Sequence, residues 1–288
     1  MAITSLIPEL WAAALYRELR QTNIWTGNVT DISGELIVGN KINIGNISNE
    51  PTVRDYVKGT ALTDPEDPDD AEKELVLNQQ KYFNIIVHDL DEIQTRPNLM
   101  ADWARKAGAK VNEGIDSYLW GAWSAGAVPA AQKVEVAALE NDLSASDENI
   151  AAFVDAILKL VKVMDDLNWP DAGRWVNIPT KGRYYLVKYL INRGVIGSGS
   201  ANDTALVSAA LDGIFGVRVR VSKSMPNVET SGSIQALGGL NSGLYYAQQV
   251  SQVEAYRPED QFADAVKGLF VYGSVLMDGT RRVSINHA

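Results

Sequence analysis

The chain has 288 residues, 46% of them hydrophobic and 22% charged, which predicts a folded protein with one large or two moderate cores. It has no cysteine, which excludes disulfides, thiolate metal sites and cysteine nucleophiles. The net charge of −10 argues against a basic nucleic-acid-binding footprint, and no apolar run approaches the roughly 20 residues that span a bilayer. The N-terminus lacks a signal-peptide pattern, so we expect a soluble protein made in a cytoplasm, with no membrane partner.

The N-terminal segment is predicted to be an arm. Residues 5–20 have the spacing of a short amphipathic helix, and a loose connector follows through Gly27. Trp11 and Trp25 lie in this arm, where their burial requires cover from another element or another subunit. We therefore expect both to be anchors between subunits. Residues 35–47 alternate apolar residues with glycine and asparagine, which indicates short strands.

A polar hairpin is predicted next. Residues 52–58 and 74–80 are typical of two β-rich arms around a Pro/Asp loop. Polar side chains such as Arg54, Asp55 and Lys58 leave the arms little apolar face for a core. Because an isolated two-stranded hairpin is marginal in water, we expect another subunit to hold it.

The hairpin carries an acidic run over residues 64–74. Seven acids stand against Lys73 alone, so the run supplies −6 of the net charge of −10. Two interpretations remain open: a solvated tip that suppresses unwanted strand pairing, or a docking site for basic groups on a neighbour. A calcium loop does not fit, because Pro65 and Pro68 interrupt the ligand spacing.

One very long amphipathic helix is predicted over 95–124, preceded by an apolar strand over 81–89. Apolar residues recur at every fourth position from Leu99 to Trp123. Thr95 fits the N-cap, and glycine and proline close the far end. A helix of this length is roughly 40 Å long, which suits an extended subunit with a spine.

The second half of the chain has an α/β pattern. Ser146 is expected to cap a helix, a short strand covers 174–178, and Thr180 caps a second helix. A third helix is predicted to begin at Asn202 or Asp203 and to end near Gly213. The clearest strand alternates Val217, Val219 and Val221 with polar residues.

The C-terminal part is predicted to return to strands. The Gly/Ser-rich segment LGGLNSGLYYAQQ, residues 237–249, is expected to be an exposed loop. Strands are expected over 250–258 and 269–288. The turn MDGT, residues 277–280, lies between apolar runs and is a hairpin signal.

No catalytic, cofactor or metal site is predicted, and no cofactor is expected. His88 lies beside Asp89 and Asp91, but neighbouring residues of a strand point to opposite faces, so a strand-end role is the better interpretation. Gly197 and Gly199 lack the strand and helix that a phosphate loop requires. The tryptophans outside the arm are interpreted as packing residues.

The order of these segments resembles the major capsid proteins of tailed double-stranded DNA bacteriophages, the Hong Kong 97-like fold. Local phrases resemble that family as well: IPELWAAAL, NEPTVRDYVKG, QQKYFNIIVHDLDEIQ and EDQFADAVKGLFVYGSVLMDGTRRVSI. The resemblance covers essentially the whole chain and rests on the co-linear series more than on any one motif.

The resemblance implies an α+β fold with four parts. They are an N-terminal arm (1–30), the first part of a P-domain (31–133) with an extended E-loop (49–82) and a spine helix (95–124), an α/β A-domain (134–250), and the terminal strands of the P-domain (251–288). The candidate residues for contacts between subunits are Trp11, Trp25, Arg54, Lys58, Asp64, Glu66, Asp67, Asp69 and Asp70.

The implied function is structural and not enzymatic. Copies of the chain would form pentamers and hexamers of an icosahedral shell that encloses the genome without sequence-specific DNA binding. Assembly is expected in the host cytoplasm with a portal. The arm begins within ten residues of Met1 and leaves no long scaffolding extension, so either a separate scaffolding protein serves the shell or the chain is a mature form, and Met1 favours the separate protein. The alternatives are an encapsulin-like compartment around a cargo enzyme and a soluble α/β enzyme.

Overall fold

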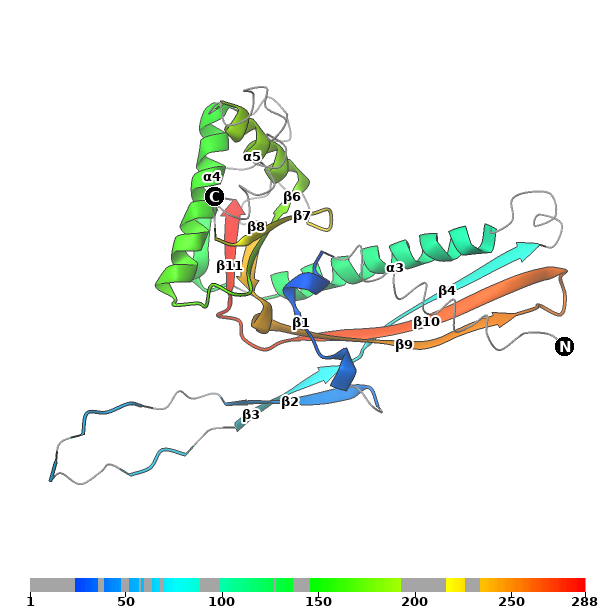
Figure 1. Ribbon diagram of the computed structural model, residues 1–288, viewed down its shortest axis with the longest axis horizontal. Coiled ribbons are helices and arrows are strands. Elements are labelled where there is room, and N and C mark those ends of the chain that lie inside the picture. Colours follow the sequence, from blue (N-terminus) through cyan, green and yellow to red (C-terminus); the bar gives the residue numbers. More distant parts are fainter. Residues whose placement is uncertain are drawn as a thin grey trace.

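In the residues that it describes, the structure combines three sheets with three long helices and extends well beyond a compact core (Figure 1). It is a computed structural model. It describes residues 24–35, 39–47, 52–56, 58–59, 64–67, 70–88, 99–126, 128–136, 146–192, 216–225 and 234–287. The predicted arm helix at 5–20 and the predicted helix at 202–213 lie outside these residues. Short 3-10 turns occur at η1 (Thr26–Asn28), η2 (Ser33–Glu35), η3 (Ala130–Gln132) and η4 (Asn241–Gly243).

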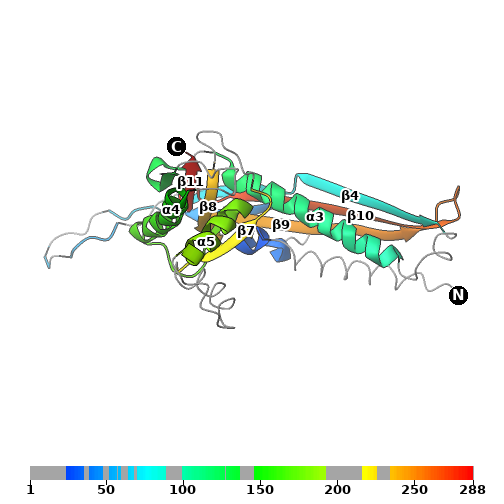
Figure 2. The same ribbon diagram turned by 90° about the horizontal axis from the view of Figure 1, so that it is seen from above.

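The first sheet is long and is covered on one face by the predicted spine helix. Its strands, in spatial order, are β1 (Thr30–Asp31), β9 (Leu244–Tyr256), β10 (Ala263–Leu276) and β4 (Gln79–His88). Helix α3 (Leu99–Ser124) runs along this sheet (Figure 2). Tyr118 of α3 meets Tyr272 of β10 edge-on, with ring centroids 5.2 Å apart. The apolar stripe is buried from Ile115 onward, whereas Trp103 near the start of α3 is about half exposed (49%).

The second sheet has five strands and packs against two helices. Its order is β5 (Lys133–Val136), β11 (Arg282–His287), β8 (Ile234–Leu240), β6 (Arg174–Pro179) and β7 (Arg218–Ser222). Helix α4 (Asp147–Asp166) begins as predicted, because the Ser146 side chain accepts a hydrogen bond from the amide of Asn149. Its residues Ile150, Phe153 and Ile157 recur at helical spacing and are buried against the sheet. Helix α5 (Thr180–Asn192) follows β6 directly.

The prediction of an exposed loop over 237–249 is wrong. Residues 237–240 belong to β8 and are buried, and β9 begins at Leu244. The two glycines are required for packing: a Cβ on Gly239 would lie 2.8 Å from the carbonyl oxygen of Arg281, and one on Gly238 would lie 3.0 Å from that of Trp175. A glycine pair that is typical of a turn therefore serves here as a close contact between strands.

The prediction of a hairpin at residues 277–280 is also wrong. Strand β10 pairs with β4 and β9, whereas β11 pairs with β5 and β8, so the turn carries the chain from one sheet to the other. A turn within a hairpin and a turn between two sheets have the same local sequence signals, and only the pairing partners of the flanking strands distinguish them. As a consequence, the terminal strand joins the five-stranded sheet and not the sheet of the spine helix.

A two-stranded hairpin projects from the long sheet (Figure 1). It pairs β2 (Lys41–Ile47) with β3 (Asp70–Val76) from Lys41↔Val76 to Ile47↔Asp70. The strand predicted within 35–47 is confirmed, but the predicted arms at 52–58 and 74–80 are misplaced. Residues 52–56 lie beyond the ladder and have no strand partner, and residues 79–80 already belong to β4.

Candidate assembly surfaces

The root of the hairpin is fixed to the body by apolar packing. Leu75 and Leu77 are buried and pack with Ile32 and Ala247, which lie on the neighbouring part of the long sheet. On β10, a Cβ at Gly273 would lie only 2.2 Å from the carbonyl oxygen of Val76. The glycine therefore allows the backbone turning from β3 into β4 to lie directly on β10.

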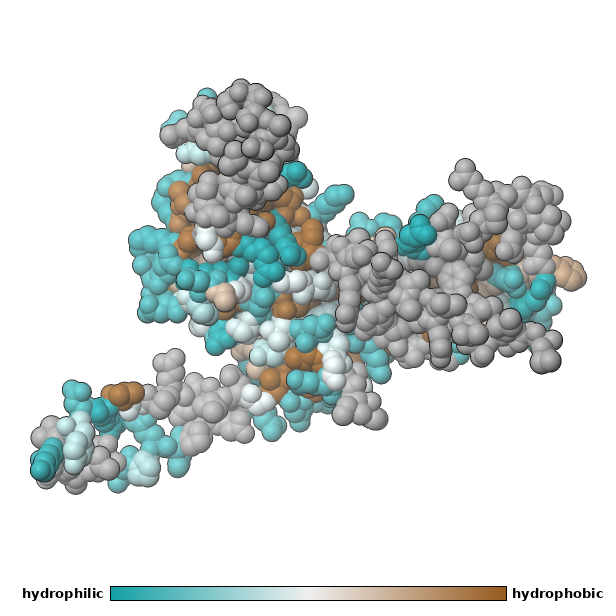
Figure 3. Space-filling model, in the orientation of Figure 1, coloured by the Kyte–Doolittle hydropathy of each residue, from teal (hydrophilic) through white to brown (hydrophobic). Residues whose placement is uncertain are grey.

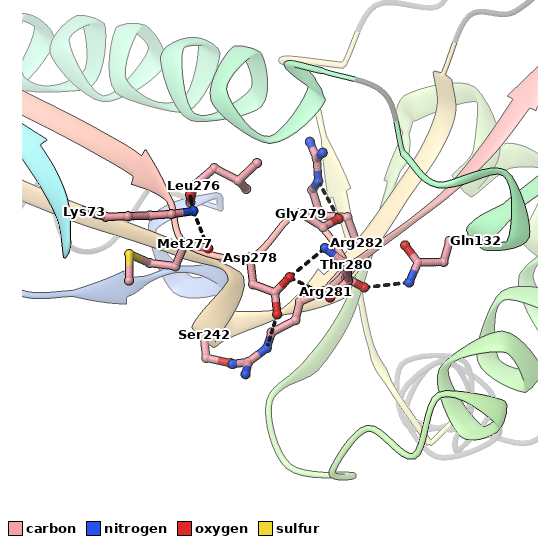
Figure 4. A network of polar contacts seen from close by, with 10 residues as sticks. All are labelled: Lys73, Gln132, Ser242, Leu276, Met277, Asp278, Gly279, Thr280, Arg281 and Arg282. Carbon is pink, nitrogen blue, oxygen red and sulfur yellow. Dashed lines mark hydrogen bonds and ion pairs between the residues drawn. The ribbon is translucent and has the colours of Figure 1, made fainter. Parts of the chain in front are cut away.

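Lys73 adds a polar attachment farther along β3. Its ammonium group donates hydrogen bonds to the carbonyl oxygens of Leu276 (3.0 Å) and Met277 (2.6 Å), at the end of β10 (Figure 4). The neighbouring residues Glu72 and Glu74 are exposed, as the two-residue period of a strand requires. The only base of the acidic run thus faces the body.

The turn after β10 is a polar joint between the two sheets (Figure 4). Asp278 accepts hydrogen bonds from the amide (2.8 Å) and hydroxyl (2.6 Å) of Thr280 and pairs with Arg281 (3.1 Å). Burial alone would raise the pKa of Asp278, but the hydrogen bonds from Thr280 and the charge of Arg281 outweigh it and lower that pKa. Gln132 donates to the Thr280 carbonyl at 2.7 Å.

Arg282 ties this joint to the end of the spine helix. It is buried, and its guanidinium donates to the carbonyl oxygens of Trp123 and Ala125, both at 2.7 Å. These carbonyls belong to the C-terminal end of α3, where the helix dipole is negative and favours a cation. Burial lowers the pKa of the guanidinium. These partners are neutral carbonyls, so the helix end itself stabilises the charge.

The projecting loop beyond the hairpin has a polar character and no apolar cover from the described part of its own chain (Figure 3). Arg54 and Glu66 form an ion pair of 3.1 Å, and Glu66 also accepts the amide of Thr52 at 3.0 Å. Val53 is 94% exposed and Tyr56 71% exposed. An exposed valine and tyrosine at the end of an arm are suited to a contact outside the subunit.

The predicted contact residues of the hairpin lie together on this loop. Arg54, Lys58, Asp64, Glu66 and Asp67 are all exposed. Glu66 is already paired with Arg54 in the same chain, which reduces the charge that it can offer to a neighbour.

The structure gives little information on three other predicted contact residues, Asp70, Trp11 and Asp69. The backbone of Asp70 pairs with Ile47 at the outer end of the ladder. Trp11 and Asp69 lie outside the described residues, so both stay predictions.

The structure corrects the prediction for Trp25. Its side chain is fully buried, its ring lies 5.6 Å from Trp120 and 5.7 Å from Trp175, and its indole N–H donates to Ser222 at 2.8 Å. No surface of Trp25 remains for a neighbour. The cover that the sequence left unassigned comes from α3, β6 and β7 of the same chain.

Asp116 is a buried acid that the sequence interpretation missed. It lies on α3 next to Ile115 and accepts hydrogen bonds from the amides of Ile24 and Trp25, each at 3.2 Å, which fixes the backbone at these two residues. Burial raises the pKa of Asp116 to about 6, although the two amides oppose the shift. A single acid within an apolar helical stripe was the available signal. Both carboxylate oxygens are engaged by the backbone, which is a structural role.

A groove of about 520 Å³ adjoins Asp116, between α3, the start of α5 and the end of β7. Arg183 and Lys223 line it opposite Glu113. The hydrogen bond and charge of Lys110 lower the pKa of Glu113. Across the described ranges, no three His, Asp or Glu side chains are close enough to hold a metal ion.

Two other sequence predictions can be placed on the described residues. His88 is the last residue of β4 and is exposed, whereas Asp89 and Asp91 lie outside the residues that the structure describes. None of the described helices is both long and apolar enough to cross a membrane.

Comparison with known proteins shows the fold. No family model and no curated protein matches the sequence. A chain of Mycobacterium phage Che8 is 22% identical, with a TM-score of 0.60 over 92% of this chain and 91% of that chain. A chain of the capsid of cyanophage P-SCSP1u is 16% identical, with a TM-score of 0.65 over 93% and 88%. A chain of a virus-like particle from Pyrococcus furiosus is 13% identical, with a TM-score of 0.58 over 98% and 100%. The chain thus has the mixed α+β fold of these capsid and particle structures, and the predicted resemblance is confirmed at the level of the fold.

Proposed function

We propose that this chain is the major capsid protein of a tailed double-stranded DNA bacteriophage. Its function is structural: copies of the chain form pentamers and hexamers that close into an icosahedral shell around the genome. The observation that carries the proposal is a projecting hairpin whose loop has no apolar cover from the described part of its chain. The chain that carries this hairpin matches a phage capsid chain over 93% of its own length. An arm of this kind gains its contacts from another copy.

The finer layout follows from the same resemblance. The hairpin and its loop correspond to the E-loop, α3 to the spine helix of a P-domain, and the five-stranded sheet with α4 and α5 to an A-domain around the symmetry axes. Residues 1–30 correspond to the N-terminal arm, and Asp116 holds the backbone of its residues Ile24 and Trp25. Each arm would lie over adjacent subunits, and contacts that are weak singly become strong through repetition.

The net charge of −10 supports enclosure of DNA without sequence-specific binding, because the chain has no overall basic charge to bind the phosphate backbone.

The partners are other copies of the chain, a separate scaffolding protein and a portal. The place of function is the virion, after assembly in the cytoplasm of the bacterial host. The role is not enzymatic, and Asp116, the buried acid with the raised pKa, has both carboxylate oxygens bound by backbone amides.

The test is assembly of the purified protein. We expect the expressed chain, alone or with its scaffolding protein, to sediment as large particles that negative-stain microscopy shows to be closed shells. Elution only as a monomer or small oligomer under both conditions would contradict the proposal.

A second candidate is a shell around protein cargo, of the encapsulin-like kind. The match to the Pyrococcus furiosus virus-like particle favours it, because it covers all of that chain and 98% of this one. The contents of native particles separate the two functions. Nuclease-protected DNA of uniform length supports the phage capsid, whereas a single enzyme without DNA supports the cargo shell.

A further inference from the structure

Lys73 is the one base of the acidic run, and the structure turns it away from the acids. Its ammonium group contacts the carbonyl oxygens of Leu276 and Met277 at 3.0 and 2.6 Å, at the end of the central strand β10 (Figure 4). The other lysine of the paired strands β2 and β3, Lys41, has a different environment: it forms an exposed 2.6 Å ion pair with Glu74, within the hairpin.

Two contacts between the hairpin and the body fix the direction in which the hairpin projects, whereas a single contact would let the hairpin rotate. Leu75 and Leu77 form the inner, apolar attachment, with the partly buried Ile42 and Ile44 of β2 packed against it. Lys73 forms the polar attachment, farther out on the same side of β3. The contact of Lys73 lies farther out along β3 than the buried Leu75. Apolar packing is not directional, so with the apolar contacts alone the hairpin could rotate about its root.

We propose that Lys73 is a positioning residue that sets the direction in which the hairpin leaves the body and thereby the place where the loop meets another copy of the chain. This inference rests on the proposed shell function. It adds to that function by naming the contact that controls the geometry of the arm.

A small rotation at Lys73 causes a large displacement of the loop, because the loop lies far from Lys73. Glu66 lies seven residues beyond Lys73, a distance of up to about 23 Å at roughly 3.3 Å per residue. A rotation of about 10° at Lys73 then moves Glu66 by about 4 Å, which exceeds the tolerance of hydrogen bonds and close packing. Copies with a variable hairpin direction could not make the same contact at every position of a closed shell.

The first experiment measures the direction in unassembled subunits. The chain has no cysteine, so spin labels on Thr52→Cys in the loop and Ser117→Cys on α3 report a single distance by pulsed electron paramagnetic resonance. We expect a narrow distribution for the parent protein. Lys73→Met, which keeps the aliphatic stem and removes the donors, should broaden the distribution by about 4 Å or more. The matched control Lys41→Met and the conservative Lys73→Arg should leave it narrow.

The second experiment measures assembly of the same variants. Lys73→Met should lower the yield of closed shells by about tenfold or more and give mixed diameters, because each shell repeats the misdirected contact. Lys41→Met and Lys73→Arg should give shells of the parent diameter. Near-ultraviolet circular dichroism of the subunits should be the same for all variants.

Equal distance distributions for Lys73→Met and Lys41→Met would overturn the proposal. So would loss of the tertiary signal in both Lys73 variants, since Lys73 would then be a folding residue. The distance measurement does not depend on shells. If the parent protein formed no shells at all, the proposed function would fail, while the distributions would still decide the role of Lys73.

Discussion

The body and the hairpin of this molecule are stabilised in different ways. Large aromatic side chains such as Trp25, Trp123 and Trp175 are fully buried in the body and contact one another edge-on or tilted. The described part of the hairpin and its loop has exposed ion pairs, Lys41–Glu74 on the strands and Arg54–Glu66 on the loop, and such pairs contribute about 0 to 1 kcal/mol each. The difference teaches that the free energy of folding resides in the body, whereas the projecting loop contributes little to it, as we expect of a segment that we propose to contact another copy.

A charge placed in the core of the body should have the largest effect on the free energy of unfolding. Ile115 of α3 is 1% exposed, and Ile115→Asp should destabilise the subunit by about 4 kcal/mol or more, because a carboxylate would lose its hydration without a partner. Urea denaturation followed by circular dichroism measures this. The control Ser117→Asp places the same charge two residues away on the exposed face of α3 and should change stability by about 0.5 kcal/mol or less. Equal losses would show that this helix has no buried face.

Much of this body could be predicted from its sequence, because the signals were local. The cap at Ser146, the helical spacing of Ile150, Phe153 and Ile157, and the alternation near Val219 each reflect contacts within one element. The spine helix was predicted over 95–124 and is described from Leu99 to Ser124.

The features that were not predicted depend on distant segments. Gly238 and Gly239 resemble a loop until Trp175 and Arg281, far away in sequence, approach too closely for a Cβ. Trp25 resembled an exposed anchor because its cover lies on α3, β6 and β7. The pairing of β2 with β3 was missed because a polar ladder has little periodic signal of its own, and its register depends on the root at Leu75 and Leu77.

The attachment of the arm to the body should respond to pH with an intermediate effect. Because burial raises the pKa of Asp116 to about 6, the folded subunit binds this proton more tightly than the unfolded chain does. Its contribution to stability is therefore present at low pH, below the unfolded pKa of about 4, and is lost as pH rises through about 6.

The variant Asp116→Asn isolates this contribution. Between pH 4 and pH 7 the stability of the parent protein, relative to Asp116→Asn, should fall by about 2 kcal/mol. Denaturant titrations at several pH values measure the difference. A constant difference, or one that grows with pH, would contradict the burial of this carboxylate.

The ion pair of the loop should have a small effect on the isolated subunit. Glu66→Gln removes the charge that faces Arg54 at 3.1 Å, and we expect a change in unfolding free energy of less than about 1 kcal/mol that disappears at 1 M salt. Glu74→Gln, opposite Lys41, is the matched control on the strands of the hairpin. A loss of several kcal/mol at Glu66 would place this pair in the folding core and would remove the distinction between body and loop.

The most direct test of the central claim is removal of the loop from an otherwise intact subunit. Deleting residues 52–67 keeps the ladder from Lys41↔Val76 to Ile47↔Asp70 and leaves six residues to close it. The unfolding free energy should change by only about 1 kcal/mol, since a shorter loop alters closure entropy slightly, whereas microscopy should show no normal closed shells. Normal, stable shells from the deletion variant would contradict the account, as would a subunit that no longer folds.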